Sequence, residues 1–363
     1  MPSRGERRRS NRERNRIRAS RRHRVMTVAT AELFRGILPR NMLPLGFGSG
    51  ALLSKRRTRR EALRLLEAAM DCGVTYFDTA RMYGAGRAEG ILGELTARNR
   101  ERLVLASKAG ILPQSRALHV RARSRSIRLL HKVVPSSRNY LPVPSASVPH
   151  FGAFGLVEFQ ESVETSLKEL RTDYLDILLL HECSAADLEE TDLLHVLDGL
   201  KREGKVRAFG IATGIEETTS ILKRHAALLD VVQIPSAIWN MNVRRLPTIE
   251  GLVITHSSLT SRFNILLDRL LSDERMAAEW HSLTKVDPRD STELAHLLLA
   301  HALNANPNGI VIFFSSSPAN VVANVKSVSS RAIDEKQIAG LNALLARKDV
   351  AEFFETSFRG LNF

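Results

Sequence analysis

The sequence predicts a single domain with an α/β fold: a closed (β/α)8 barrel of eight parallel strands surrounded by helices. Two observations predict it. Eight short runs rich in Val, Ile and Leu alternate along the chain with stretches whose apolar residues recur at helical spacing, which is typical of parallel α/β folds. These runs lack strict apolar–polar alternation, as expected for strands that are buried on both faces. The pattern alone also allows an open, doubly wound sheet.

The expected elements follow in chain order. The first helix, residues 58–72, has Thr58 as its N-cap, an apolar stripe that includes Leu65, and Gly73 directly after its end. The other expected helices are residues 157–170, 192–203, 293–304 and 317–328. The expected strands are residues 43–48, 74–78, 103–108, 175–181, 206–212, 231–235, 252–256 and 309–314.

Residues 110–155 interrupt this rhythm after the third strand. They show no clear strand or helix and contain five Pro residues. In a barrel this long loop lies over the face formed by the carboxyl ends of the strands, and a segment of this length without regular structure is usually functional or disordered. Its basic residues are Arg116, Arg121, Arg123, Arg125, Arg128, Lys132 and Arg138.

The net charge of +14 is concentrated at the N-terminus. Residues 1–25 contain eleven Arg and two Glu, a local charge of +9, which leaves +5 for the remainder. This segment has no apolar periodicity, so we expect residues 1–30 to form a disordered basic tail before a barrel domain at residues 31–363. An arm for nucleic acid or an anionic membrane surface is one interpretation. A solvated tail, or an extension upstream of a start at Met26, is the simpler one.

Composition argues against several protein classes. Apolar residues make up 44% and charged residues 25% of the chain, which is ordinary for a soluble domain. No apolar run approaches the ~18 residues that span a bilayer, and the basic N-terminus lacks the apolar region of a secretory signal. The two cysteines and the lack of zinc spacing predict no metal site and a reducing compartment, the cytoplasm. The oligomeric state is not predicted.

Polar side chains end three consecutive expected strands. Asp78 ends the second strand, Lys108 the third and His181 the fourth, while Tyr83 lies in the loop after Asp78. The carboxyl ends of barrel strands meet at one face, where barrel enzymes carry their working residues. Each residue alone has an ordinary structural explanation, but the coincidence of all four predicts an active site.

This set of residues suits the reduction of a carbonyl group. A carbonyl that accepts hydride becomes an alkoxide and needs a proton in the same step. A phenol has a pKa of about 10, and the nearby ammonium of Lys108 lowers it. Asp78 keeps that ammonium charged, and His181 can hydrogen-bond the substrate oxygen or the phenol. General-acid help of this kind typically contributes ~10²–10⁴ in rate.

The chain resembles the aldo/keto reductase family from about residue 43 to residue 324. The strongest similarity lies in GVTYFDTARMYGAGRAEGILGEL, followed by ASK, LRTDYLDILLLHE and KREGKVRAFGIA. The resemblance implies the (β/α)8 fold, a small carbonyl substrate, and reduction of an aldehyde or ketone to an alcohol, or the reverse, with NADP or NAD as cofactor. It also implies a catalytic tetrad of Asp78, Tyr83, Lys108 and His181, with Tyr83 as the acid.

The resemblance further implies which residues hold the cofactor. Ala212 and Thr213 match the positions where the family commonly has Ser-Asn for the nicotinamide carboxamide, and Gln233 matches a family glutamine. His256 stands where an aromatic residue stacks on the nicotinamide. The other matching positions are Ser257 and Leu259 near the pyrophosphate, and Ser315, Ser317 and Asn324 in the adenosine-phosphate segment.

The segment FFSSSPANVVANV departs from the family in its charge. Phe314, Ser316 and Asn320 occupy the positions from which basic side chains usually meet the ribose 2′-phosphate, a group that needs Arg or Lys. This departure makes a preference for NADH an alternative to NADPH, unless arginines of the long loop supply the charge. Ser317 followed by Pro318 also fits a capped helix start, and a helix N-terminus binds phosphate.

Three other functions are compatible with parts of the sequence. The main alternative is a cofactor-binding regulatory protein of the same fold with little turnover, which Ala212 and Thr213 favour. A Schiff-base enzyme built on Lys108 would need a lowered pKa for that amine, which Asp78 opposes. A nucleic-acid-binding surface on the basic tail and the long loop lacks any recognised accompanying motif.

Overall fold

The computed structural model describes residue 34 and residues 36–54, 57–114, 125–127, 129–130, 132–133 and 148–358. The expected basic tail, residues 1–30, lies outside the described residues, so a domain boundary there stays a prediction. Five of the seven basic residues of the long loop also lie outside them: Arg116, Arg121, Arg123, Arg128 and Arg138.

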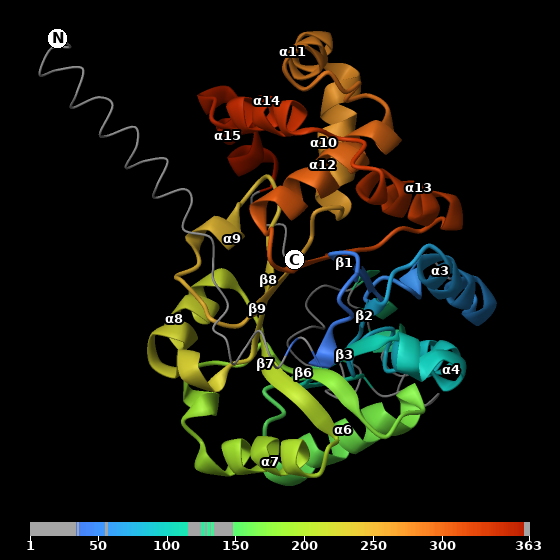
Figure 1. The fold of residues 1–363 in the computed structure, drawn as a ribbon, viewed down its shortest axis with the longest axis vertical. Helices are drawn as coiled ribbons and strands as arrows, with labels where there is room; N and C mark the ends of the chain where they lie inside the picture. Colours follow the sequence, from blue (N-terminus) through green and yellow to red (C-terminus); the bar gives the residue numbers. More distant parts are fainter. Residues whose placement is uncertain are drawn as a thin grey trace, which may run out of the picture.

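Eight parallel strands close into a barrel in the order β1-β10-β9-β8-β7-β6-β3-β2 (Figure 1). β1 (Leu45–Gly48) closes the ring, because it pairs with both β2 (Tyr76–Asp78) and β10 (Ile310–Phe313). The predicted barrel is confirmed, and the open sheet is excluded. The remaining strands are β3 (Val104–Ala109), β6 (Leu175–His181), β7 (Val206–Ala212), β8 (Val231–Pro235) and β9 (Leu252–His256).

Helices surround this barrel, and all five expected helices are present. Thr58 caps α3 (Arg59–Asp71) in a capping box with Glu61, and Gly73 takes a positive φ of 95° just after it. The other expected helices are α6 (Leu156–Leu170), α7 (Thr191–Arg202), α12 (Ser291–Ala305) and α13 (Pro318–Ser329). Further helices around the strands are α4 (Ala88–Asn99), α8 (Ile215–His225) and α9 (Asn242–Arg245), with 3-10 turns at Arg100–Arg102, Ala186–Leu188 and Ala226–Leu228.

Four more helices form a C-terminal lobe on one side of the barrel (Figure 1). The lobe comprises α10 (Ser261–Ser272), α11 (Glu274–Thr284), α14 (Glu335–Leu345) and α15 (Lys348–Ser357). Its apolar core is separate from the shell between strands and helices, and it is built around the fully buried Trp280. Leu259, in the loop between β9 and α10, packs against both cores. Within the described residues, no helix is both long and apolar enough to cross a membrane.

The long loop after β3 contains regular structure that the sequence analysis missed. β4 (Ile111–Leu112) pairs antiparallel with β5 (His150–Phe151), which brings the two ends of the loop together. The expectation of no strand in residues 110–155 was therefore wrong. Strands of two residues are too short to carry a period-two pattern, so the sequence could not reveal them.

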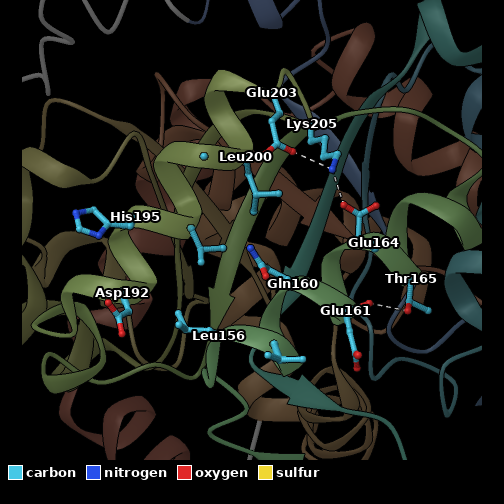
Figure 2. Close-up of a pocket in the computed structure, with 13 residues that line it drawn as sticks. Leu156, Gln160, Glu161, Glu164, Thr165, Asp192, His195, Leu200, Glu203 and Lys205 are labelled. Carbon is cyan, nitrogen blue, oxygen red and sulfur yellow. Dashed lines mark hydrogen bonds and ion pairs between the residues drawn. The ribbon is translucent and has the colours of Figure 1, made fainter.

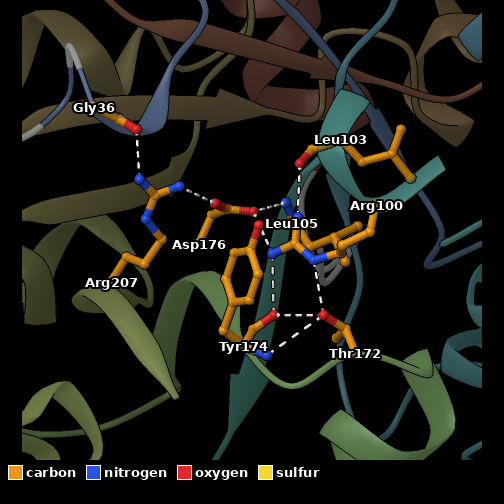
Figure 3. Close-up of polar contacts among 8 residues, drawn as sticks. All are labelled: Gly36, Arg100, Leu103, Leu105, Thr172, Tyr174, Asp176 and Arg207. Carbon is orange, nitrogen blue, oxygen red and sulfur yellow. Dashed lines mark hydrogen bonds and ion pairs between the residues drawn. The ribbon is translucent and has the colours of Figure 1, made fainter. Parts of the chain in front are cut away.

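A buried carboxylate ties together the amino-terminal end of the barrel (Figure 3). Asp176 on β6 is 2% exposed and accepts hydrogen bonds from Arg100 Nη2 at 2.9 Å, the Leu105 amide at 2.9 Å and Arg207 Nη1 at 3.0 Å. Arg207 also donates to the carbonyl of Gly36. The network therefore links β3, β6 and β7 to the segment that enters the barrel.

Replacing Asp176 with Asn should lower the free energy of unfolding by about 3 kcal/mol, because it leaves the two guanidinium groups without their buried carboxylate. Urea unfolding followed by circular dichroism measures the change. Glu164→Gln is the control, since it removes a carboxylate that pairs with Lys205 at the exposed surface, and its effect should be far smaller. Equal effects of the two substitutions would contradict this account of Asp176.

Candidate active site

The four expected catalytic residues meet at the carboxyl ends of β2, β3 and β6. Asp78 Oδ1 accepts a hydrogen bond from Lys108 Nζ at 2.6 Å, and the same ammonium donates to the carbonyl of Thr79 at 2.9 Å. Lys108 Nζ lies 4.9 Å from the centre of the Tyr83 ring. The rings of Tyr83 and His181 meet edge to face, and their centres lie 6.0 Å apart. The phenol is thus bordered by an ammonium and an imidazole.

Burial and charge set the protonation states of this tetrad. Burial lowers the pKa of Lys108, but Asp78 and Tyr83 more than offset this and leave it raised, so the amine is an ammonium. Burial lowers the pKa of His181 to about 3, and the charge of Lys108 adds to the effect. His181 is therefore neutral at physiological pH and serves as a hydrogen-bonding group.

The pKa of Tyr83 differs from the sequence-based expectation. Lys108 does act to lower it, as expected, but burial raises it more strongly, and the net pKa lies above its usual value. The phenol is consequently protonated at neutral pH and is available as a proton donor.

The buried carboxylate of Glu89 anchors the loop that carries Tyr83. Glu89, at the start of α4, accepts hydrogen bonds from Ser107 Oγ at 2.7 Å and from Arg81 Nη1 at 3.3 Å. Directly after Tyr83 the chain turns at Gly84, whose φ is 59°. A Cβ at Gly84 would lie 2.7 Å from Leu53 Cδ1, so both the turn and the close packing favour glycine.

Several expected cofactor residues follow one another along the neighbouring strand ends. Ala212 ends β7 and is the register partner of Gln233 on β8, and His256 ends β9. Thr213 Oγ1 donates to Glu182 Oε2 at 3.3 Å. His256 Nδ1 lies 2.8 Å from the Ser257 hydroxyl, and burial, followed by the charge of Lys108, lowers the pKa of His256 to about 3.

Gln233 connects this row to the tetrad and fits an amide-bearing ligand. Its Nε2 donates to Asp78 Oδ2 at 3.1 Å across the barrel. Its buried Oε1 has no partner among the described residues, and neither has His181 Nδ1. Buried polar atoms normally find a partner, so the free oxygen of Gln233 suits a donor such as the amide of a nicotinamide carboxamide.

The expected adenosine segment follows β10 at the start of α13. Ser315 and Ser317 are partly exposed, and Asn324 is buried. Ser317 occupies the N-cap position before Pro318, but its side chain makes no capping hydrogen bond. The first amides of α13 are therefore not capped by that hydroxyl, which suits a phosphate at this helix end.

Sequence reasoning missed Arg57, which precedes α3. Its Nη2 donates to the carbonyl of Ser316 at 3.3 Å, and its guanidinium lies 5.7 Å from the centre of the Phe314 ring. It therefore stands beside two of the positions where the sequence lacks a basic side chain. The two contacting segments are 259 positions apart, so no local signal in the sequence could have paired them.

Glu182 is a second residue that the sequence analysis did not single out. It follows His181 directly, and its φ of 54° is unusual for a residue with a side chain. Burial raises the pKa of its carboxyl group, and its negative charge acts on Tyr83. Its strained backbone could not be foreseen from the sequence. Among the described residues no cluster of side chains suits a metal ion, and Cys72 and Cys183 are free thiols.

Comparison with known proteins gives relatives along the barrel. The chain is similar to a 6-dehydroglucose reductase of Novosphingobium aromaticivorans, with 27% identity over 188 residues, 49% of this chain and 50% of that protein. It is 30% identical over 189 residues to a D-threo-aldose 1-dehydrogenase of Pseudomonas sp, covering 51% of this chain and 54% of that protein. The chain thus spans about half the length of the curated relatives it matches.

The fold has a counterpart among solved structures. An aldo/keto reductase from Klebsiella pneumoniae, in complex with NADP and acetate, has a TM-score of 0.59 at 21% identity and covers 85% of this chain and 94% of that one. The profile described as "Aldo/keto reductase family" matches residues 44–249, more than half of the chain. The barrel, the strand-end residues and this match agree, and the chain belongs to the aldo/keto reductase family.

Proposed function

We propose that this chain reduces an aldehyde or ketone of a small molecule to an alcohol, or catalyses the reverse reaction, with a nicotinamide cofactor and Tyr83 as the general acid. The observation that carries the proposal is the buried Lys108–Asp78 ion pair beside a protonated phenol and a neutral imidazole. NADPH or NADH would supply hydride to the carbonyl carbon. Ala212, Thr213, Gln233, His256, Ser257, Leu259, Ser315, Ser317 and Asn324 would hold that cofactor.

Each residue of the tetrad would have a distinct task. As negative charge develops on the carbonyl oxygen, Tyr83 donates its hydroxyl proton to that oxygen, and the product is an alcohol. Lys108 stabilises the phenolate that remains, and Asp78 holds Lys108 in place. His181 is neutral and orients the carbonyl oxygen by a hydrogen bond. Solvent then returns the proton to Tyr83.

The substrate class and location are also proposals. The curated relatives named above act, by their names, on a dehydroglucose and an aldose, which makes sugar-like carbonyl compounds the first substrates to assay. The free thiols of Cys72 and Cys183 support a reducing compartment, and we propose the cytoplasm. A regulatory protein that binds cofactor with little turnover is the second candidate, supported by the apolar Ala212 where the family has a polar residue. Cofactor binding without turnover would favour it.

Tyr83→Phe should lower kcat by ~10²–10⁴ while leaving the Kd for NADPH nearly unchanged, because only the proton donor is removed. Steady-state reduction of an aldose or aromatic aldehyde and fluorescence titration with NADPH measure the two quantities. Tyr174→Phe is the matched control: it removes a hydroxyl from the ring that stacks on Arg100 at the opposite end of the barrel. Full activity of Tyr83→Phe would refute the mechanism.

The pH dependence of kcat/KM should follow the tetrad. The acid must be protonated, so activity is present below the pKa of Tyr83 and is lost as the pH rises through it, above its usual value of about 10. Because the pKa of His181 is lowered to about 3, no loss is expected between about pH 5 and pH 8. A loss of activity with a midpoint near the ordinary histidine pKa of about 6.5 would contradict this.

Arg57 should give the chain a preference for NADPH, because its guanidinium stands where the family's 2′-phosphate ligands are missing. We expect Arg57→Gln to raise the Kd for NADPH by about tenfold or more and to change the Kd for NADH little. Fluorescence titrations with both cofactors measure this. Arg59→Gln, which loses an exposed pair between the first residue of α3 and Glu94 on α4, is the control. Equal losses for both cofactors would show that Arg57 does not read the phosphate.

A further inference from the structure

A groove lies between α6 and α7 on the outer side of the barrel (Figure 2). Its volume is about 760 Å³, and it shares no residue with the tetrad or with the expected cofactor positions. Apolar side chains of both helices line it, among them Val157, which is 69% exposed, and Leu156, which is 39% exposed. These exposed apolar side chains give a segment lying in the groove an apolar surface to contact.

The groove carries negative charge on a protein that is otherwise basic. Its carboxylates are Glu161, Glu164, Asp192 and Glu203, against the single ammonium of Lys205. Lys205 is already shared between Glu164 at 2.6 Å and Glu203 at 2.9 Å (Figure 2). With His195 counted as neutral, the groove has a net charge of −3, whereas the chain outside residues 1–25 carries +5.

Two of these carboxylates, Glu161 and Asp192, are available to pair with a basic side chain of another segment. Within the described ranges the structure records no ion pair for Glu161 or Asp192. Both are exposed, one on α6 and one in the first turn of α7. A basic segment lying in the groove could therefore pair with both carboxylates, while the aliphatic parts of its side chains cover the apolar wall.

The chain itself contains a segment of the matching charge. Residues 1–25 hold eleven Arg and two Glu, a net +9. The described part of the chain begins near the groove, because the carbonyl of Gly36 accepts a hydrogen bond from Arg207, two residues beyond Lys205 in the wall. With residues 1–25 in the groove, the eight residues 26–33 form the tether and span up to ~28 Å when extended, whereas the 15-residue α6 is only about 22 Å long. The chain is therefore long enough for residues 1–25 to contact the groove of the same molecule.

We propose that the groove between α6 and α7 is the docking site for this chain's own Arg-rich segment, residues 1–25. Guanidinium groups pair with Glu161 and Asp192 at the rim, and the contact is electrostatic and weakened by salt. The proposal is independent of the reductase mechanism, since none of these residues lies in the tetrad. A second copy of the chain is the competing occupant.

Trypsin digestion of the full-length protein tests the proposal, because trypsin cuts after the arginines of residues 1–25 only when they are accessible. The cutting rate is followed by intact mass at low salt. We expect Glu161→Lys/Asp192→Lys to speed cutting within residues 1–25 at least fivefold over the wild type, and about 500 mM salt to remove the difference. The milder Glu161→Gln/Asp192→Asn variant should give an intermediate rate and guards against misfolding of the first.

The control is Glu274→Lys/Glu355→Lys on the C-terminal lobe, which repeats the same charge change in a first helical turn and at an exposed position of another helix. Trypsin should cut residues 1–25 of this control variant at the wild-type rate. Equal rates in the wild type, the groove variants and the control would overturn the proposal. Protection that grows with protein concentration, together with dimers in sedimentation, would assign the groove to a second copy and would also overturn it. Retained reductase activity in the groove variants keeps this outcome separate from any failure of the proposed function.

Discussion

The pairing of β1 with both β2 and β10 is the constraint on which the site depends. Closure brings strands that are far apart in sequence to opposite sides of one narrow ring. Gln233 on β8 can reach Asp78 on β2 only across that ring, and the two residues are 155 positions apart. Asp78 therefore receives a hydrogen bond from each side, one from Lys108 and one from Gln233. An open sheet with the same strands could not hold the carboxylate in this way.

Asp176 at the amino-terminal end of the barrel differs in its partners from Gln233 and His181 at the carboxyl-terminal end, although Tyr76 Oη at the start of β2 is also buried without a partner among the described residues. At the amino-terminal end, both oxygens of Asp176 have partners, and the network stabilises the fold. At the carboxyl-terminal end, Gln233 Oε1 and His181 Nδ1 are buried without partners in the described part of the chain. A buried polar atom without a partner costs about 1–3 kcal/mol, so such atoms are expected where a ligand, rather than the fold, supplies the hydrogen bond.

Much of the barrel could be predicted from the sequence because its signals are local. Buried apolar runs gave the bounds of β6, β7, β8 and β9, and Thr58 marked the start of α3. The proximity of Asp78, Tyr83, Lys108 and His181 could be predicted because each lies near a strand end, and their catalytic roles stay predictions. The missed features depend on distant contacts or on backbone geometry. Arg57 meets Ser316 only in the closed barrel, and the two-residue strands β4 and β5 exist only as partners of each other.

The net pKa of Tyr83 also could not be predicted from the sequence, because two opposing effects determine it. The sequence places an ammonium near the phenol, and Lys108 lowers the pKa as expected. The sequence does not show how far the half-buried ring of Tyr83 is withdrawn from water. Desolvation outweighs the charge, and only the three-dimensional packing reveals which effect is larger.

Leu259 packs against the core of the barrel and against the core of the C-terminal lobe, and it is also one of the residues proposed to contact the cofactor. Helix α12 also contributes to both cores, with Leu298 in the lobe core and Leu299 in the barrel core, so Leu259 is one of several contacts that join them. A ligand that contacts Leu259 restrains the lobe as well as the barrel. By thermodynamic linkage, whatever restrains the lobe in its liganded arrangement would in turn strengthen ligand binding by the same factor, so ligand affinity and lobe order are coupled quantities.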